Sequence, residues 1–314
     1  MNVWGRMLFV AYDGDLLTAI TDPKGLTYLT NWYDANGRVQ FQRLADGGTY
    51  TFAYTLAGST VTQTQVTDPR GNVTTSTFNA AQYVATMTVA WQLTTYTRQA
   101  GTNLLTQVTD ALSRVTAYTY DSNGNVLTLT DPEFNTTTFT YEPTFNRVAT
   151  ITDALTPAHV TTFTYNDVAR TTTITNPLSK QTVIQYNSAG QPTTVTDPLS
   201  HATSFGYDSQ GNLTTTTDAL GNVTTRQYDP VSRLLSLIDP RGKITRFQYD
   251  LLNHVTQIQD ALNGTTAFTY DLNGNLLTVN DAKNQTTTYT YDQYNRLTLA
   301  ASSAYNGPFQ LDCE

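Results

Sequence analysis

The chain has 314 residues, of which only 13% are Asp, Glu, Lys or Arg. Its formal net charge is −8. The basic residues form no cluster, so neither nucleic acid nor an anionic membrane surface is an expected partner. No apolar run approaches the roughly 20 residues that span a bilayer, which argues against membrane insertion. Cys313 is the only cysteine, so no intrachain disulfide can form.

An aromatic residue, often followed by an acid, recurs every 18, 21 or 24 residues along the chain. A fixed period in this range indicates copies of one supersecondary unit, none of which buries its apolar face alone. We therefore expect one array over residues 1–301 and a tail or partial cap over 302–314. Phe78 and Tyr96 hold two positions of the series, and the others are Tyr12, Tyr33, Tyr54, Tyr120, Tyr141, Tyr165, Tyr186, Tyr207, Tyr228, Tyr249, Tyr270 and Tyr291.

The first clear turn is Asp22-Pro23-Lys24-Gly25. Asp opens such a turn by bonding its own backbone, Pro fits the second position, and Gly takes the left-handed conformation. Two turns per period leave two strands of about 6 residues. The sequence thus predicts an all-β repeat array of about fourteen antiparallel β-hairpins in a long curled or spiralling sheet. Its structural turn residues include Asp22, Asp68, Asp131, Asp197, Asp218, Asp239, Gly124, Gly211 and Gly274.

The pattern is least regular over residues 61–119, where one Asp-Pro turn is missing and Trp91 stands near the expected turn. We expect longer or shorter hairpins there.

The pattern is clearest from Gly124 to Gly274. On the returning strands, pairs such as Phe139 and Tyr141 lie two residues apart and therefore on one face. Stacked repeats would form an aromatic ladder, each buried ring contributing roughly 1.5–3 kcal/mol. On the outgoing strand, Val126 and Leu129 lie three residues apart and would fall on opposite faces of a regular strand. Either a bulge lies between them or both faces of the strand are partly covered.

The motif Tyr-Asp-x-x-Gly-Asn, followed by Thr-Asp-Pro-x-Gly-Asn, resembles the RHS, or YD-repeat, family over residues 12 to about 300. That family includes bacterial polymorphic toxins, shell-forming components of insecticidal toxin complexes, and teneurins. The resemblance implies hairpins that join into a spiralling hollow shell able to enclose a C-terminal toxin. The family's self-cleaving aspartate motif is not recognisable. The residues that carry the resemblance include Tyr120-Asp121, Gly124-Asn125, Thr130-Asp131-Pro132, Tyr207-Asp208, Gly211-Asn212, Tyr249-Asp250 and Tyr270-Asp271.

Nearly all carboxylates fall in turns, where the structural role of Asp explains them. The segments Asp121–Asn125 and Asp271–Asn275 resemble the start of a calcium loop but lack its closing bidentate Glu. The three histidines, His159, His201 and His254, have no metal-type or nucleophile-type partner motif and are expected on the surface or in loops. The sequence predicts no catalytic residue, no metal site, no cofactor and no enzyme.

We therefore expect a non-catalytic structural protein whose hairpin wall builds an extracellular or cell-surface shell, tube or fibre. Unpaired strand edges at the ends of the array favour self-association with another copy or a neighbouring array, as in a filament. Two alternatives stay open. One is an adhesin-like module that binds glycan or protein, with Trp4, Trp32 and Trp91 beside the tyrosines as a platform. The other is a fragment of a shell that encapsulates a toxin.

Overall fold

The protein is built from β-strands over residues 8–303, the part that this computed structural model describes. It has 28 strands, and the pairings between chain neighbours are antiparallel. The predicted all-β array of about fourteen hairpins is therefore confirmed. Over these residues, no helix is long and apolar enough to cross a membrane. The contacts divide the chain into unit 1, residues 1–49 with 204–314, and unit 2, residues 50–203.

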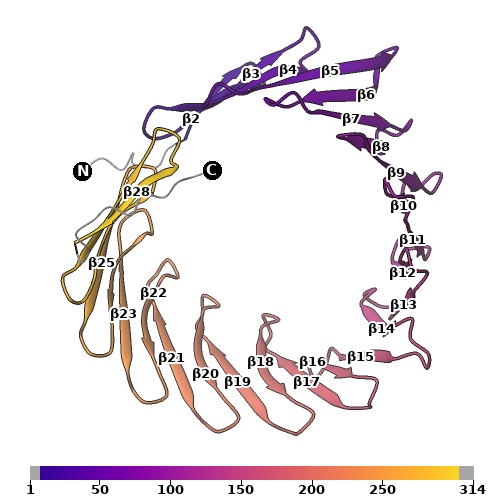
Figure 1. Ribbon diagram of the computed structural model, residues 1–314. Helices are drawn as coiled ribbons and strands as arrows, with labels where there is room; N and C mark the ends of the chain where they lie inside the picture. Colours follow the sequence, from indigo (N-terminus) through magenta and orange to yellow (C-terminus); the bar gives the residue numbers. More distant parts are fainter. Residues whose placement is uncertain (1–7, 304–314) are drawn as a thin grey trace. The chain divides into compact units, whose positions relative to one another are not determined.

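Unit 2 is an antiparallel meander. Its strands are β5 (Thr49–Ala57), β6 (Thr60–Thr67), β7 (Val73–Phe78), β8 (Val84–Val89), β9 (Gln92–Arg98), β10 (Leu105–Thr109), β11 (Val115–Tyr120), β12 (Val126–Thr130), β13 (Thr136–Tyr141), β14 (Val148–Thr152), β15 (Val160–Asn166), β16 (Thr171–Thr175), β17 (Gln181–Tyr186) and β18 (Pro192–Thr196). They follow one another along a curve (Figure 1). Within residues 61–119, β8 and β9 are joined by the tight turn Ala90-Trp91, in which both residues have positive φ.

Unit 1 holds two runs of antiparallel strands that lie far apart in the sequence. The first run is β1 (Phe9–Asp13), β2 (Leu16–Thr21), β3 (Thr27–Tyr33) and β4 (Val39–Leu44). The second run is β19 (Ala202–Tyr207), β20 (Leu213–Thr217), β21 (Val223–Tyr228), β22 (Leu234–Ile238), β23 (Ile244–Tyr249), β24 (Val255–Gln259), β25 (Thr265–Tyr270), β26 (Leu276–Asn280), β27 (Thr286–Tyr291) and β28 (Leu297–Ser302).

The turns are held by their opening side chain. In the turn from β12 to β13, Asp131 Oδ1 accepts hydrogen bonds from the backbone N–H of Glu133 at 2.9 Å and of Asn135 at 2.8 Å. The residue between these two donors, Phe134, has a φ of 65°. The same position is Gly221 in the turn that Asp218 opens, with a φ of 82°. Asp therefore satisfies the turn's N–H groups, and the left-handed residue directs the chain into the next strand.

A β-bulge follows the repeat aromatic. Tyr120 of β11 pairs with Val126 of β12, and Thr119 pairs with Thr128, so Leu127 has no partner residue. The extra residue restores Val126 and Leu129 to one face, which resolves the two alternatives left by the sequence in favour of the bulge. The same shift occurs at Tyr12, Tyr33, Phe78, Tyr141, Tyr186, Tyr207, Tyr228, Tyr249, Tyr270 and Tyr291.

At many of these bulges, a tyrosine hydroxyl of the following repeat joins the two repeats. Tyr141 Oη on β13 donates to the carbonyl of Val126, the residue that opens the bulge, at 2.8 Å. A bulge disrupts the ladder locally, so this bond satisfies backbone that the sheet does not. The same bond joins Tyr33 to Leu17, Tyr120 to Leu105, Tyr165 to Val148, Tyr228 to Leu213, Tyr249 to Leu234, Tyr270 to Val255 and Tyr291 to Leu276.

The wall has no apolar core. Among residues 8–303, no apolar side chain is buried, and the repeat tyrosines are half-buried except Tyr12, which is exposed. The aromatic ladder therefore gains less than the full burial energy that the sequence suggested. Hydrogen bonds between threonine hydroxyls on neighbouring strands also link the sheet, as between Thr140 and Thr150 at 2.6 Å. Stability must come mainly from strand pairing, bulge bonds and half-covered rings.

Replacing Tyr141 by Phe should lower the free energy of unfolding by about 1 kcal/mol, because the Val126 carbonyl loses its donor. Tyr186→Phe is the matched control: Tyr186 is half-buried, and its hydroxyl has no bond among the described residues. It should change stability by less than about 0.5 kcal/mol. Urea unfolding of both variants measures the difference, and equal losses would contradict the role of the bulge bond.

Phe134→Gly should stabilise the protein by about 0.5–1 kcal/mol, because the left-handed backbone conformation costs free energy for a non-glycine residue. The ring is 85% exposed, so little packing is lost. At the equivalent position, Gly221→Ala should cost about 1 kcal/mol, although a Cβ there would meet no atom within 4 Å. Melting temperatures that move in the same direction for both variants would refute the conformational explanation.

Candidate functional site

The candidate site is a cluster of turns in unit 1 that joins its two runs of strands. We call it the turn cluster and define it as residues 22–26, 250–254, 271–275 and 292–296. The first segment connects β2 to β3, and the others connect β23 to β24, β25 to β26 and β27 to β28. Each segment has the Asp-opened geometry described above. The cluster is where the first hairpins of the chain contact the last ones.

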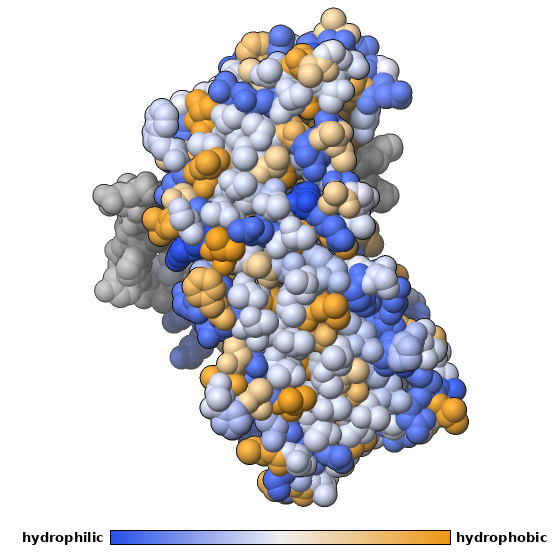
Figure 2. Space-filling view, turned by 90° about the vertical axis from the view of Figure 1, so that its right-hand side faces the viewer, coloured by the Kyte–Doolittle hydropathy of each residue, from blue (hydrophilic) through white to orange (hydrophobic). Residues whose placement is uncertain are grey.

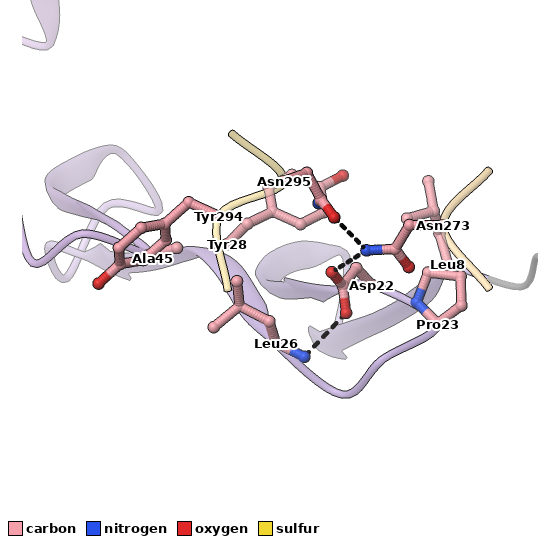
Figure 3. Close-up of a pocket in the computed structure, with 9 residues that line it drawn as sticks. All are labelled: Leu8, Asp22, Pro23, Leu26, Tyr28, Ala45, Asn273, Tyr294 and Asn295. Atoms are coloured by element: carbon pink, nitrogen blue, oxygen red, sulfur yellow. Dashed lines mark hydrogen bonds between the residues drawn. The ribbon is translucent and has the colours of Figure 1, made fainter. Parts of the chain in front are cut away.

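Asp22 is the most buried member of the cluster, with only 5% of its surface exposed. Its Oδ1 accepts from Leu26 N–H at 2.8 Å, and its Oδ2 accepts from Asn273 Nδ2 at 2.7 Å. Asn273 Nδ2 also donates to Asn295 Oδ1 at 2.9 Å. Figure 3 shows these bonds bridging the two runs of strands. One amide group thus connects three turns.

Lys24 forms the ionic contact of the cluster. Its Nζ lies 2.6 Å from Asp271 Oδ2 and donates to Asn295 Oδ1 at 3.1 Å. The side chains of Lys24 and Asp271 are 31% and 15% exposed, so the pair is shielded from much of the solvent. Removing one partner would leave a largely buried charge without compensation.

His254 continues the cluster on the next turn. Its Nδ1 lies 2.8 Å from Asp250 Oδ2, and its ring stacks on Tyr270 with centroids 4.5 Å apart and an interplanar angle of 20°. Its Nε2 is buried and has no hydrogen-bond partner. His254 lies in a turn, which fits the expectation of a surface or loop histidine, but its side chain is only 11% exposed because it packs against Asp250 and Tyr270.

Two open cavities border the cluster. One, of about 510 Å³, is lined by Asp22, Leu26, Tyr28, Tyr294 and other residues drawn in Figure 3. The second, of about 620 Å³, is lined by His254, Tyr270, Asp271 and Lys24, among others. Over residues 8–303, no group of three His, Cys, Asp or Glu side chains is placed to hold a metal ion. The arrangement can hold two parts of a chain together by charge and hydrogen bonding.

The carboxylates of the cluster are stabilised in the ionised form. Burial is the largest influence on the pKa of Asp22 and raises it, but bonds from Leu26 N–H and Asn273 outweigh burial and leave the pKa below its usual value. The pKa of Asp271 is also lowered, because bonds from Lys24 and Asn275 outweigh burial, again the largest single influence. The turn cluster is therefore held in its charged form at neutral pH.

Among the turn residues predicted from sequence, the structure brings only Asp22 and the turn of Gly274 together. Asp68, Asp131 and Asp197 open separate turns along one edge of unit 2, and Asp218 and Asp239 open two neighbouring turns along one edge of unit 1. Gly124 and Gly211 close turns on the opposite edge. The predicted aromatics lie along the wall, where Tyr270 alone stacks on a cluster side chain.

Sequence reasoning missed Lys24, His254, Asn273 and Asn295 as a group. Each occupies an ordinary repeat position, and nothing local distinguishes it from its counterparts in other turns. One signal was available for Lys24: it is a cation at a turn position where several other turns carry leucine.

The fold and the turn cluster define a class of protein, a wall of repeated β-hairpins tied together at its turns. Two family models match this chain. The RHS repeat model matches residues 101–133, 186–223 and 207–244, and the teneurin YD-shell model matches residues 238–307. Residues 101–133 and 186–307 of this chain thus resemble the RHS, or YD-repeat, family.

One solved structure shares the fold. The crystal structure of TcdB2-TccC3 without its hypervariable C-terminal region matches 88% of this chain at 14% identity, with a TM-score of 0.56. A TccC3-mutant Tc holotoxin pore of Photorhabdus luminescens matches 97% of the chain at 14% identity, with a TM-score of 0.32. This chain covers 18% and 25% of those two chains. The comparison with curated proteins finds no match.

Lys24→Met should lower the free energy of unfolding by about 1–2 kcal/mol, because Asp271 keeps its charge in a shielded position without a partner. Lys283→Met is the matched control, since Lys283 holds the same turn position after Asp281 but is exposed and has no ion pair among the described residues. Its effect should stay within about 0.5 kcal/mol. Chemical denaturation of both variants provides the measurement; indistinguishable midpoints would contradict the bridging role of Lys24.

Acid should weaken the turn cluster. The pKa of Asp271 in the folded protein lies below the reference value of 3.8, so its stabilisation is present above that pH and is lost as the pH falls through the folded pKa. The stability difference between the native chain and Asp271→Asn should therefore shrink as the pH falls below 3.8. Urea midpoints across this range measure it, and a difference that grows on acidification would oppose the assignment.

Proposed function

We propose that this chain is a non-catalytic wall module that builds an extracellular or cell-surface shell, tube or fibre by self-association. The family and the repeat-built wall support a structural role. The observation that carries the proposal is the open edge of β1, which pairs with β2 and has no second partner strand within residues 8–303. An unpaired edge presents backbone donors and acceptors to another chain.

The side chains of β1 suit such a contact. All five residues of the strand are exposed, and Phe9, Val10 and Tyr12 each expose more than half of their surface. Natural proteins usually protect an edge of this kind with lysine, proline or a bulge. β1 has a bulge at Tyr12 but carries no lysine or proline. The part of the edge before the bulge, Phe9 to Ala11, keeps regular strand register and therefore favours strand addition by a second copy.

The hydrogen bonds of the tyrosine hydroxyls favour the structural role over the adhesin-like alternative. Eight of their hydroxyls already donate to backbone carbonyls, as Tyr249 does to Leu234 at 2.9 Å. A sugar platform would need such hydroxyls and ring faces to be open to the ligand.

Val10→Lys tests the proposal, because a lysine on an edge strand opposes pairing with another strand. Electron microscopy of the native chain at increasing concentration should show fibres, tubes or shells, and the variant should form few or none. Val73→Lys, which places the same change at the start of the interior strand β7, is the control and should assemble normally. Uniform single particles of the native chain at all concentrations would refute self-association.

A second candidate function is a wall segment of a shell that encloses a toxin. The fold shared with the TcdB2-TccC3 chain supports it. Coexpression of this chain with the polypeptide encoded next to it should then protect that polypeptide from added protease. Equal digestion with and without this chain would count against enclosure.

A further inference from the structure

One edge of unit 2 carries a row of exposed apolar side chains. Six consecutive turns, each leading from an even-numbered strand to the next odd-numbered one, present one large apolar residue apiece. We call this row the apolar rim: Trp91, Leu112, Phe134, Leu155, Leu178 and Leu199. Their exposed fractions run from 58% to 96%.

The opposite edge of unit 2 differs. Its turns present mainly small or polar residues, including Ser59, Ala81, Ser122 and Ala189. Tyr83, Phe145 and Val168 are the large apolar exceptions. The two edges have the same backbone construction, so the contrast comes from side chains alone. Apolar character is therefore a property of one rim.

The turn geometry explains why the rim projects outward. In the turn of Leu199, Asp197 Oδ1 accepts from the N–H groups of Leu199 and His201, both at 2.8 Å. The carboxylate is thus occupied by backbone donors, and the leucine side chain is left to face solvent. By contrast, the sheet face drawn in Figure 2 shows its hydrophobic side chains scattered singly among polar ones.

The rim is large enough for a specific interface. Trp91 and Phe134 present about 150–250 Å² each and the four leucines less, so the row exposes on the order of 600 Å². This reaches the upper end of the roughly 300–600 Å² of the largest patch on a typical monomer and approaches the roughly 800 Å² per partner of a standard interface. A surface of this size is expected to be covered.

The spacing of the rim fits a second identical rim. Neighbouring turns on one edge are two strands apart, or about 9.6 Å. Two such rows can interdigitate, since a side chain of one fills the gap between two side chains of the other. Because both copies have the same curve and pitch, a two-fold arrangement matches along the whole row.

We propose that the apolar rim of unit 2 binds the same rim of a second copy, forming an isologous pair. The turn cluster of unit 1 shows that turns of this chain can contact other turns, there through matched polar groups. At the rim, apolar groups match apolar groups. The inference rests on the proposed self-association of the wall, and it adds a second contact surface separate from the edge of β1.

The test is sedimentation velocity on the full chain carrying Val10→Lys, which removes edge pairing, at about 1–100 µM. This protein should form pairs of chains. Adding Leu178→Arg and Leu199→Arg should weaken pairing at least about a hundredfold, because two anchors are lost and like charges are brought together. Arg241 occupies the same position of its own turn, so the fold accepts arginine there. Circular dichroism and melting temperature verify that the variant is folded.

Val168→Arg is the control on the opposite edge, where the side chain is 98% exposed. It should leave pairing unchanged, and 1 M salt should not weaken pairing, because the contact is apolar. A monomer in the Val10→Lys protein would overturn the rim contact while leaving the wall function, tested by microscopy of the native chain, unaffected. Equal weakening by Val168→Arg would also overturn it, since opposite edges would then meet. Unchanged pairing in the double leucine variant would do the same.

Discussion

The hydrogen bond from a repeat tyrosine to the bulge carbonyl of the preceding strand is the interaction on which this wall depends. The sheet has no buried apolar side chain over residues 8–303, so it lacks the usual source of cooperative stability. Each bulge interrupts the ladder, and the hydroxyl of the following repeat satisfies the freed carbonyl. In this way Tyr120, Tyr141 and Tyr165 link successive hairpins. The free energy of unfolding is then the sum of the stabilities of the single repeats and of the contacts between neighbouring repeats, as in other repeat proteins.

The same construction accounts for the two specialised features of the chain. Each turn is closed by backbone bonds to Asp or Asn, so the remaining turn side chains can vary without loss of the fold. In unit 1, Lys24 and Asn273 use this freedom to tie distant turns together. In unit 2, Leu178 and Leu199 use it to form an apolar rim. In both units the specialised side chains lie in turns, while the strands provide a constant scaffold.

Local rules were sufficient to predict much of the fold. The period of the tyrosines and the Asp-Pro-x-Gly turns led to hairpins of the observed length, because these signals act within a few residues. The odd spacing of Val126 and Leu129 was compatible with a bulge but did not establish it. Only the strand register distinguishes a bulge from a strand that is covered on both faces. The contact between Asp22 and Asn273 joins residues 251 positions apart. No local pattern encodes that proximity.

Amide hydrogen exchange, followed strand by strand in the native chain and in Tyr141→Phe, is the most direct test of nearest-neighbour stabilisation. If the tyrosine bond acts between neighbours, exchange should accelerate in β11 to β14 and stay unchanged in strands further along unit 2. Equal acceleration throughout the unit would show a single cooperative core instead. Unchanged exchange everywhere would show that the bond contributes nothing to the wall.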